Sequence, residues 1–133
     1  MNTKPLANCR IFYLEDDYLI AVELGLRLEE AGAEVVLCGS VSRAMDLLPN
    51  CIFDFALLDF NIAGTSSVGV AREFKQAGVP ILFLTAYARD ILPSDLASCA
   101  LLTKPAAWAQ VLGEVQSLLN ARASGEHSCC QTD

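Results

Sequence analysis

The sequence predicts an α/β fold, a doubly wound parallel sheet of five strands with five helices. Apolar residues make up 53% of the 133 residues, and the mean hydropathy is +0.40, as expected where strands are buried on both faces. Five short apolar segments recur along the chain, with amphipathic stretches between them. Alternating strands and helices with short connections favour right-handed crossovers within one parallel sheet.

Five segments are expected to form the strands because they are short and rich in branched, aromatic and other apolar residues. They are residues 10–14, 34–38, 55–58, 81–84 and 100–102. The 55–58 run is wholly apolar, which predicts a central, buried strand.

The first helix is predicted after the first strand, where Leu19, Val22 and Leu26 recur at helical spacing until Gly32 ends the segment. The second is expected over 41–48, and the third runs through Phe74 until Gly78. Each of these two helices has a pair of serines at its start that can cap it: Ser40 or Ser42, and Ser66 or Ser67.

The fourth helix is expected between 89 and 98, where Pro93 predicts a segment that is short, displaced or restarted at the proline. The fifth is expected from an apolar stripe that begins at Trp108 and continues to Leu119. We expect one domain over residues 1–123 and a disordered polar tail over 124–133, with no output domain.

Charge and hydropathy exclude several functions. The net charge of −7 argues against direct nucleic-acid binding, since phosphate backbones are held by clustered Lys and Arg. No apolar stretch approaches the length of a membrane span, and no export leader is evident, so we expect a cytoplasmic protein without membrane contact. Four cysteines lie in or beside apolar segments and are expected to be reduced structural thiols: Cys9, Cys38, Cys51 and Cys99. Cys129 and Cys130 are treated as incidental to the tail.

Polar side chains follow four of the five predicted strands. Glu15, Asp16 and Asp17 come after the first strand, and Asp59 comes after the third. Thr85 follows the fourth strand and Lys104 the fifth. The carboxyl ends of parallel strands meet at one edge of a sheet, so at least three carboxylates are expected to converge there. Like charges at that separation oppose folding unless a cation neutralises them.

A hard cation such as Mg²⁺ suits this acidic cluster, because it takes carboxylate oxygens, waters and phosphate oxygens as ligands. Asp59 is the predicted nucleophile for phosphoryl transfer, since its buried strand shelters an acyl phosphate from water. Lys104, the Thr85 hydroxyl and the backbone N–H of Ala86 are the expected donors to the phosphoryl oxygens.

The chain resembles the receiver domain of two-component response regulators from Cys9 to about Ala121. Four motifs carry the resemblance: Tyr-Leu-Glu-Asp-Asp at 13–17, Leu-Leu-Asp-Phe-Asn at 57–61, Leu-Thr-Ala at 84–86 and Thr-Lys-Pro at 103–105. The resemblance implies a flavodoxin-like sheet of order 2-1-3-4-5 and a histidine kinase or histidine phosphotransfer protein as phosphate donor.

The resemblance also implies roles for single residues. Asp16 and Asp59 would hold Mg²⁺ directly, Glu15 directly or through water, and Asn61 through its backbone carbonyl. The Lys104–Pro105 bond would be cis. A downstream protein would read the face formed by the fourth helix, fifth strand and fifth helix, with surface positions Arg89, Asp90, Trp108 and Gln110.

Two residues depart from the family pattern. Leu101 stands where an aromatic usually turns inward on activation, so output is expected to depend on Thr85 and the following loop, or on Tyr87. Ala63 replaces the proline of the loop after Asp59, so that this loop turns through Gly64 less rigidly.

Two alternative functions remain at this point. The first is a degenerate receiver that serves as a constitutive interaction module, which the presence of Leu101 suggests. The second is an aspartate-dependent phosphohydrolase, which needs a second acid two residues after the nucleophile. Asn61 occupies that position and cannot donate and regain a proton, so we expect slow self-dephosphorylation and no enzyme turnover.

Overall fold

The computed structural model describes residues 4–86 and 92–123. Its main sheet is parallel and has the order β2-β1-β3-β6-β7. The strands are β1 (Arg10–Leu14), β2 (Glu34–Cys38), β3 (Phe55–Asp59), β6 (Ile81–Thr85) and β7 (Ala100–Thr103). Counted along the chain, these five strands have the order 2-1-3-4-5, so the predicted sheet is confirmed.

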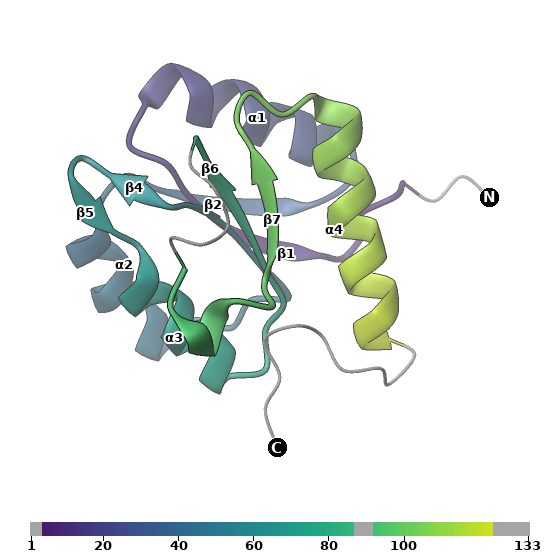
Figure 1. Cartoon of the computed structure of the whole chain (residues 1–133). Coiled ribbons are helices and arrows are strands. Elements are labelled where there is room, and N and C mark those ends of the chain that lie inside the picture. The colour runs from purple at the N-terminus through teal and green to yellow at the C-terminus, as the bar shows by residue number, and fades with distance from the viewer. Residues whose placement is uncertain (1–3, 87–91, 124–133) are drawn as a thin grey trace.

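Helices cover both faces of the sheet, as Figure 1 shows. The helices are α1 (Tyr18–Glu30), α2 (Val41–Leu47), α3 (Val68–Gln76) and α4 (Trp108–Ala123). Two apolar clusters separate accordingly: one lies under α1 and α4, and the other lies under α2 and α3. All five residues of β3 and all five of β6 are buried, because both faces of these central strands meet helices.

Within the described residues there are four α-helices where five helices were expected, and the fourth expected segment is short and starts at the proline, as one of the alternatives had it. Where the fourth helix was expected, the described part holds only a short 3₁₀ helix, η3 (Ser94–Leu96), which follows directly after Pro93. A proline lacks the backbone N–H that an α-helix interior needs, so it starts this turn instead of continuing an earlier one. Tyr87, Arg89 and Asp90 lie outside the described residues.

A small hairpin between β3 and α3 was not foreseen. It pairs β4 (Asn61–Ile62) with β5 (Thr65–Ser66) in antiparallel fashion. Ala63 and Gly64 form its turn, and both have positive φ, 52° and 87°. Such a turn suits glycine, whereas alanine adopts it at some cost in free energy.

Helix starts are capped as the serine pairs suggested. Ser40 is the N-cap of α2, and its hydroxyl accepts a hydrogen bond from the Arg43 N–H at 3.2 Å. Ser67 is the N-cap of α3, but it is the Ser66 hydroxyl that accepts from a helical N–H, that of Val68 at 3.1 Å. A second 3₁₀ helix, η1 (Leu48–Asn50), follows α2 at Pro49.

The four cysteines within the described residues are free thiols. Burial raises the pKa of the Cys9 thiol to about 11, which keeps it protonated and unreactive. Cys129, Cys130 and the expected tail over 124–133 lie outside the described part of the chain. None of the helices in that part is long and apolar enough to cross a bilayer.

Candidate phosphoacceptor and metal site

The first and third strands of the chain end side by side and deliver three carboxylates to one place. Leu14 is the register partner of Leu58, and the next residues along the two strands are Glu15 and Asp59. One carboxylate oxygen each from Glu15, Asp16 and Asp59 lie within 4.8 Å of one another. Glu15 and Asp59 are buried, whereas Asp16 is exposed. The cluster therefore opens to solvent on the side of Asp16.

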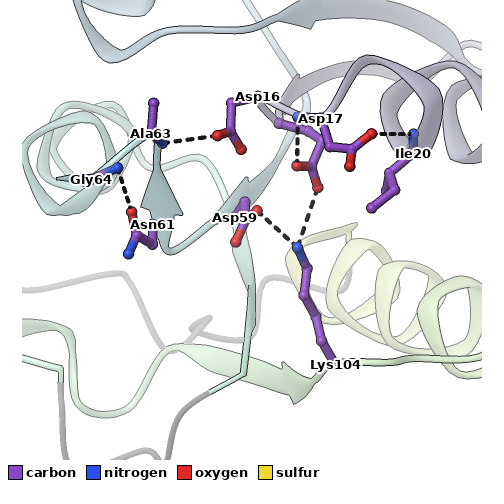
Figure 2. A network of polar contacts seen from close by, with 9 residues as sticks. Asp16, Asp17, Ile20, Asp59, Asn61, Ala63, Gly64 and Lys104 are labelled. Atoms are coloured by element: carbon purple, nitrogen blue, oxygen red, sulfur yellow. Dashed lines mark hydrogen bonds and ion pairs between the residues drawn. The ribbon is translucent and has the colours of Figure 1, made fainter.

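Lys104 supplies the positive charge of this cluster. Its Nζ donates to Asp59 Oδ2 at 2.8 Å and to Glu15 Oε1 at 3.4 Å (Figure 2). The backbone places the amine: Lys104 N–H donates to the Thr85 carbonyl at 2.7 Å, and the Lys104–Pro105 peptide bond is cis. The Lys104 side chain keeps 29% of its surface exposed, so the amine can exchange partners without leaving a closed cavity.

Burial and neighbouring charges shift the pKa values in this cluster. Burial raises the pKa of Glu15 and the nearby charge of Asp59 adds to the rise, while the Asp17 N–H and the Lys104 ammonium partly offset it. Burial alone lowers the pKa of Lys104, but the hydrogen bond to Asp59 and the two negative charges outweigh it. The net pKa shift of Lys104 is upward, so the lysine is charged at neutral pH.

Two further contacts position the acidic residues. Asp17 is the N-cap of α1 and accepts from the Ile20 N–H at 3.2 Å, while its own N–H donates to Glu15 Oε2 at 3.0 Å (Figure 2). Asp16 Oδ2 accepts from the Ala63 N–H at 2.9 Å, which ties the acidic run to the hairpin. A proline at position 63 would lack this donor.

The remaining predicted residues lie around this centre. Thr85 is buried at the end of β6, one residue after Leu84, the register partner of Asp59, and exposed Ala86 comes next. The Asn61 side chain accepts from the Gly64 N–H at 2.9 Å, so its amide stabilises the hairpin turn. The prediction that the Asn61 backbone carbonyl is a metal ligand stays a prediction.

Sequence reasoning missed two of the positioning contacts. Asp17 was grouped with Glu15 and Asp16 with no role of its own, although an Asp directly before a helical apolar stripe is a capping signal. The Ala63 N–H was missed because a single loop N–H leaves no pattern in a sequence. The sequence indicates this donor only in that position 63 is not a proline, so its backbone keeps an N–H.

Part of the face that a downstream protein is expected to read lies within the described residues. Leu101 is half-buried and packs against the cluster under α2 and α3. Trp108 is half-buried against the cluster under α1 and α4, and Gln110 is exposed, with its side chain accepting from the Ala107 N–H at 3.0 Å. Trp108 is therefore less of a surface residue than the sequence suggested.

The donor set suits a hard divalent cation. Two oxygens on opposite sides of Mg²⁺, each about 2.1 Å from the ion, are about 4.2 Å apart. The three carboxylate oxygens within 4.8 Å of one another therefore need only a small contraction to share one ion. Chemically, the arrangement offers a sheltered carboxylate, a cation site and an amine around a single point.

Comparisons with solved structures identify the fold, whereas no family model and no curated protein matches the chain. A response regulator receiver protein from Sinorhizobium medicae is 24% identical, with a TM-score of 0.75 over 86% of this chain and 96% of its own. A CheY-like receiver domain protein from Methanospirillum hungatei is 22% identical, with a TM-score of 0.79 over 88% and 98%. The response regulator TrrA from Thermotoga maritima, solved in complex with Mg(2+)-BeF, is 24% identical, with a TM-score of 0.72 over 82% and 97%.

Proposed function

We propose that this chain, which has the fold of response regulator receiver domains, accepts a phosphoryl group on Asp59 in a Mg²⁺-dependent reaction. The observation that carries the proposal is the contact of Lys104 Nζ with Asp59 Oδ2, 2.8 Å, inside a cluster of three carboxylates at the strand ends. A phosphohydrolase active site needs a second acid that can donate and regain a proton, and the residue at the corresponding position is Asn61. The site therefore supports a phosphoacceptor better than a phosphohydrolase.

In the proposed reaction an Asp59 carboxylate oxygen attacks phosphorus and a new O–P bond forms. The bond between phosphorus and the donor atom breaks, and its electron pair stays on the donor: a histidine ring nitrogen takes up a proton and leaves as neutral imidazole, whereas acetyl phosphate releases acetate. Lys104 then shifts from the Asp59 carboxylate to a phosphoryl oxygen, and Thr85 and the Ala86 N–H donate to the other oxygens. The buried strand of Asp59 limits the access of water to the product.

The proposed metal ligands are Glu15, Asp16, Asp59 and the Asn61 carbonyl. When bound, Mg²⁺ would offset the charge of the carboxylates and of the transferred group. The Ala63 N–H donates to the Asp16 carboxylate, and the Asp17 N–H donates to the Glu15 carboxylate, so both carboxylates are already oriented within the cluster. These two hydrogen bonds reduce the rearrangement that binding would need.

Mass spectrometry after incubation with acetyl phosphate and Mg²⁺ tests the proposal. The wild type should gain one phosphoryl group, and Asp59→Asn should gain none. Asp46→Asn is the matched control, because Asp46 is exposed on α2 and should label like the wild type. EDTA should abolish labelling of the wild type and of Asp46→Asn. Equal labelling of the wild type and Asp59→Asn would show that another residue is the acceptor.

We place the protein in a cytoplasmic phosphorelay, with a histidine kinase or histidine phosphotransfer protein as donor and a protein target as output. The output face proposed is β7 with α4 and the segment before β7. This proposal rests on the fold and on the position of the Lys104 end of β7 next to Asp59.

A constitutive interaction module is the second candidate, because Leu101 gives β7 no aromatic side chain that could rotate. Amide NMR spectra with and without beryllofluoride and Mg²⁺ distinguish the two functions. A switch predicts shifts that extend from Asp59 to β7 and η3. Shifts confined to residues 15–17 and 59–64 would favour the constitutive module.

A further inference from the structure

A groove of about 400 Å³ lies next to the amino end of β3, the opposite end of this strand from Asp59. It is lined by η1, by the segment before β3, by the C-terminal part of α3 and by Arg122 of α4. Most of the lining is apolar and includes Pro49, Phe53 and Phe74. The groove therefore suits an apolar occupant, and nothing in the proposed phosphoryl transfer uses it.

Two neighbouring residues of this lining remain open to solvent. Ile52 is 84% exposed, more than any other large apolar side chain of the described residues. Cys51 is partly exposed, whereas the other three cysteines of the described part are buried. A segment that covers the groove would remove the Ile52 side chain from water and would meet an accessible thiol.

The C-terminal end of α4 brings the rest of the chain to this groove. Arg122 lines the groove, and its Nη1 donates to the Asp54 carbonyl at 2.8 Å. Asp54 is only three residues after Cys51, and residues 124–133 continue directly from the end of α4. Cys129 is seven residues after Arg122, and seven extended residues span up to about 25 Å. The chain is therefore long enough to bring a tail thiol to Cys51.

The composition of residues 124–133 matches the groove at one point. Cys129 and Cys130 are the only apolar side chains among these ten residues; the others are polar, charged or glycine. A free cysteine behaves as a small hydrophobe, so this pair is the part of the segment that an apolar groove accepts. The groove thus gives a place to a cysteine pair that the sequence alone left without a role.

From these observations we infer that residues 124–133 dock in the groove, and that Cys51 forms a reversible disulfide there with the Cys129–Cys130 pair. The oxidant is a small-molecule disulfide such as oxidised glutathione. Cytoplasmic disulfides are usually transient and serve redox sensing, so this bond acts as an oxidation-dependent strap between the end of α4 and the start of β3. The inference is independent of phosphoryl transfer to Asp59.

The bond forms by two thiol–disulfide exchanges. A tail thiolate attacks one sulfur of glutathione disulfide, so that a mixed disulfide forms and one glutathione leaves as a thiolate. The Cys51 thiolate then attacks the tail sulfur, and the second glutathione leaves. Two protein thiols are oxidised to one disulfide, and their two protons pass to the two glutathione thiolates. An excess of reduced glutathione reverses both steps.

Peptide mass spectrometry of the full chain, after equilibration with glutathione buffers and alkylation of the remaining thiols, tests the bond. Trypsin leaves Cys51 as the one cysteine of peptide 44–72 and the tail pair on peptide 123–133. The two peptides linked by a disulfide should be the main oxidised product, and Cys51→Ser should abolish it. Cys9→Ser is the matched control, because Cys9 is buried and should not contribute.

The exchange equilibrium with glutathione also measures the docking, because it gives the effective concentration of the two protein thiols. This concentration should be at least about tenfold higher in the native protein than in concentrated urea. Ile52→Ala should lower the native value about twofold to tenfold, since the docked segment loses apolar contact. Leu26→Ala is the control, because Leu26 is 55% exposed on α1 and does not line the groove.

Three results would overturn the inference. Oxidation only within the Cys129–Cys130 pair, or only to glutathione adducts, would show that Cys51 and the tail do not meet. A linked peptide pair found only in a covalent dimer would place the bond between two chains. Equal effective concentrations in native buffer and in urea would show that the groove does not hold the segment.

Discussion

Replacing Lys104 by methionine removes the ammonium group that two buried carboxylates share. Methionine is about as long as lysine and keeps the apolar stem, so the change isolates the charge. In the wild type the amine lies 2.8 Å from Asp59 and 3.4 Å from Glu15, whose side chains are only 9% and 1% exposed. The variant leaves both carboxylates without a cation.

The expected loss of stability follows from this burial. Removing one partner of a fully buried ion pair costs about 3–5 kcal/mol, because the other charge is left uncompensated. The Lys104 side chain is 29% exposed, so water can reach the space that it leaves. We therefore expect the free energy of unfolding to fall by about 2 kcal/mol at neutral pH and above.

The loss should depend on pH, and the pKa directions give its sign. The folded-state pKa of Glu15 is raised, so the protonated form is favoured by folding, and this stabilisation is lost as pH rises through the folded pKa. Without Lys104 the pKa of Glu15 rises further. Lys104 itself, with a raised pKa, stays charged up to alkaline pH. Glu15 of the variant takes up a proton more readily as pH falls, so the loss should be smaller at about pH 5 than at pH 8.

Urea denaturation in EDTA at the two pH values measures this difference. Lys104→Arg keeps the charge and is the control; its loss should be smaller and should vary little between the two pH values. Equal losses for Lys104→Met at pH 5 and pH 8 would refute the reasoning, because the effect would then come from packing and not from uncompensated carboxylates.

Two further predictions concern backbone conformation and helix capping outside the site. Gly78→Ala should lower the free energy of unfolding by about 1 kcal/mol, because Gly78 has φ of 74° and nothing within 4 Å of a new Cβ, so only backbone strain changes. Gly113→Ala, in the middle of α4 and equally open, should instead raise it by about 0.5–1 kcal/mol; the same sign for both variants in urea denaturation would contradict the conformational argument. Ser40→Ala should cost about 1 kcal/mol through loss of the cap on α2, and Ser40→Asp should retain most of the stability in thermal denaturation. A similar loss in both variants would mean that the cap oxygen does not stabilise α2.

The linear order of residues was enough to predict much of this protein. Apolar runs and helical periodicity defined the strands, and parallel pairing brings the carboxyl ends of those strands to one edge. The convergence of Glu15, Asp16, Asp59 and Lys104 follows from that rule, because it depends on where each strand stops and not on fine side-chain geometry. The strand order, in contrast, was expected only from the resemblance to receiver domains, because alternating strands and helices do not by themselves fix which strands are neighbours.

Only the tertiary structure decided which partner each polar group takes. Asp17 caps α1, Asp16 accepts from the Ala63 N–H, and the segment after Pro93 forms a 3₁₀ turn where a helix was expected. The buried Tyr13 hydroxyl has no hydrogen-bond partner among the described residues, although the sequence shows only a strand residue. Hydrogen bonds depend on direction and on distances of a few tenths of an ångström, which the three-dimensional packing sets. Burial follows a periodic pattern of apolar residues, so it can be predicted from the sequence. Each of these hydrogen bonds is a single contact without such a pattern, so it cannot.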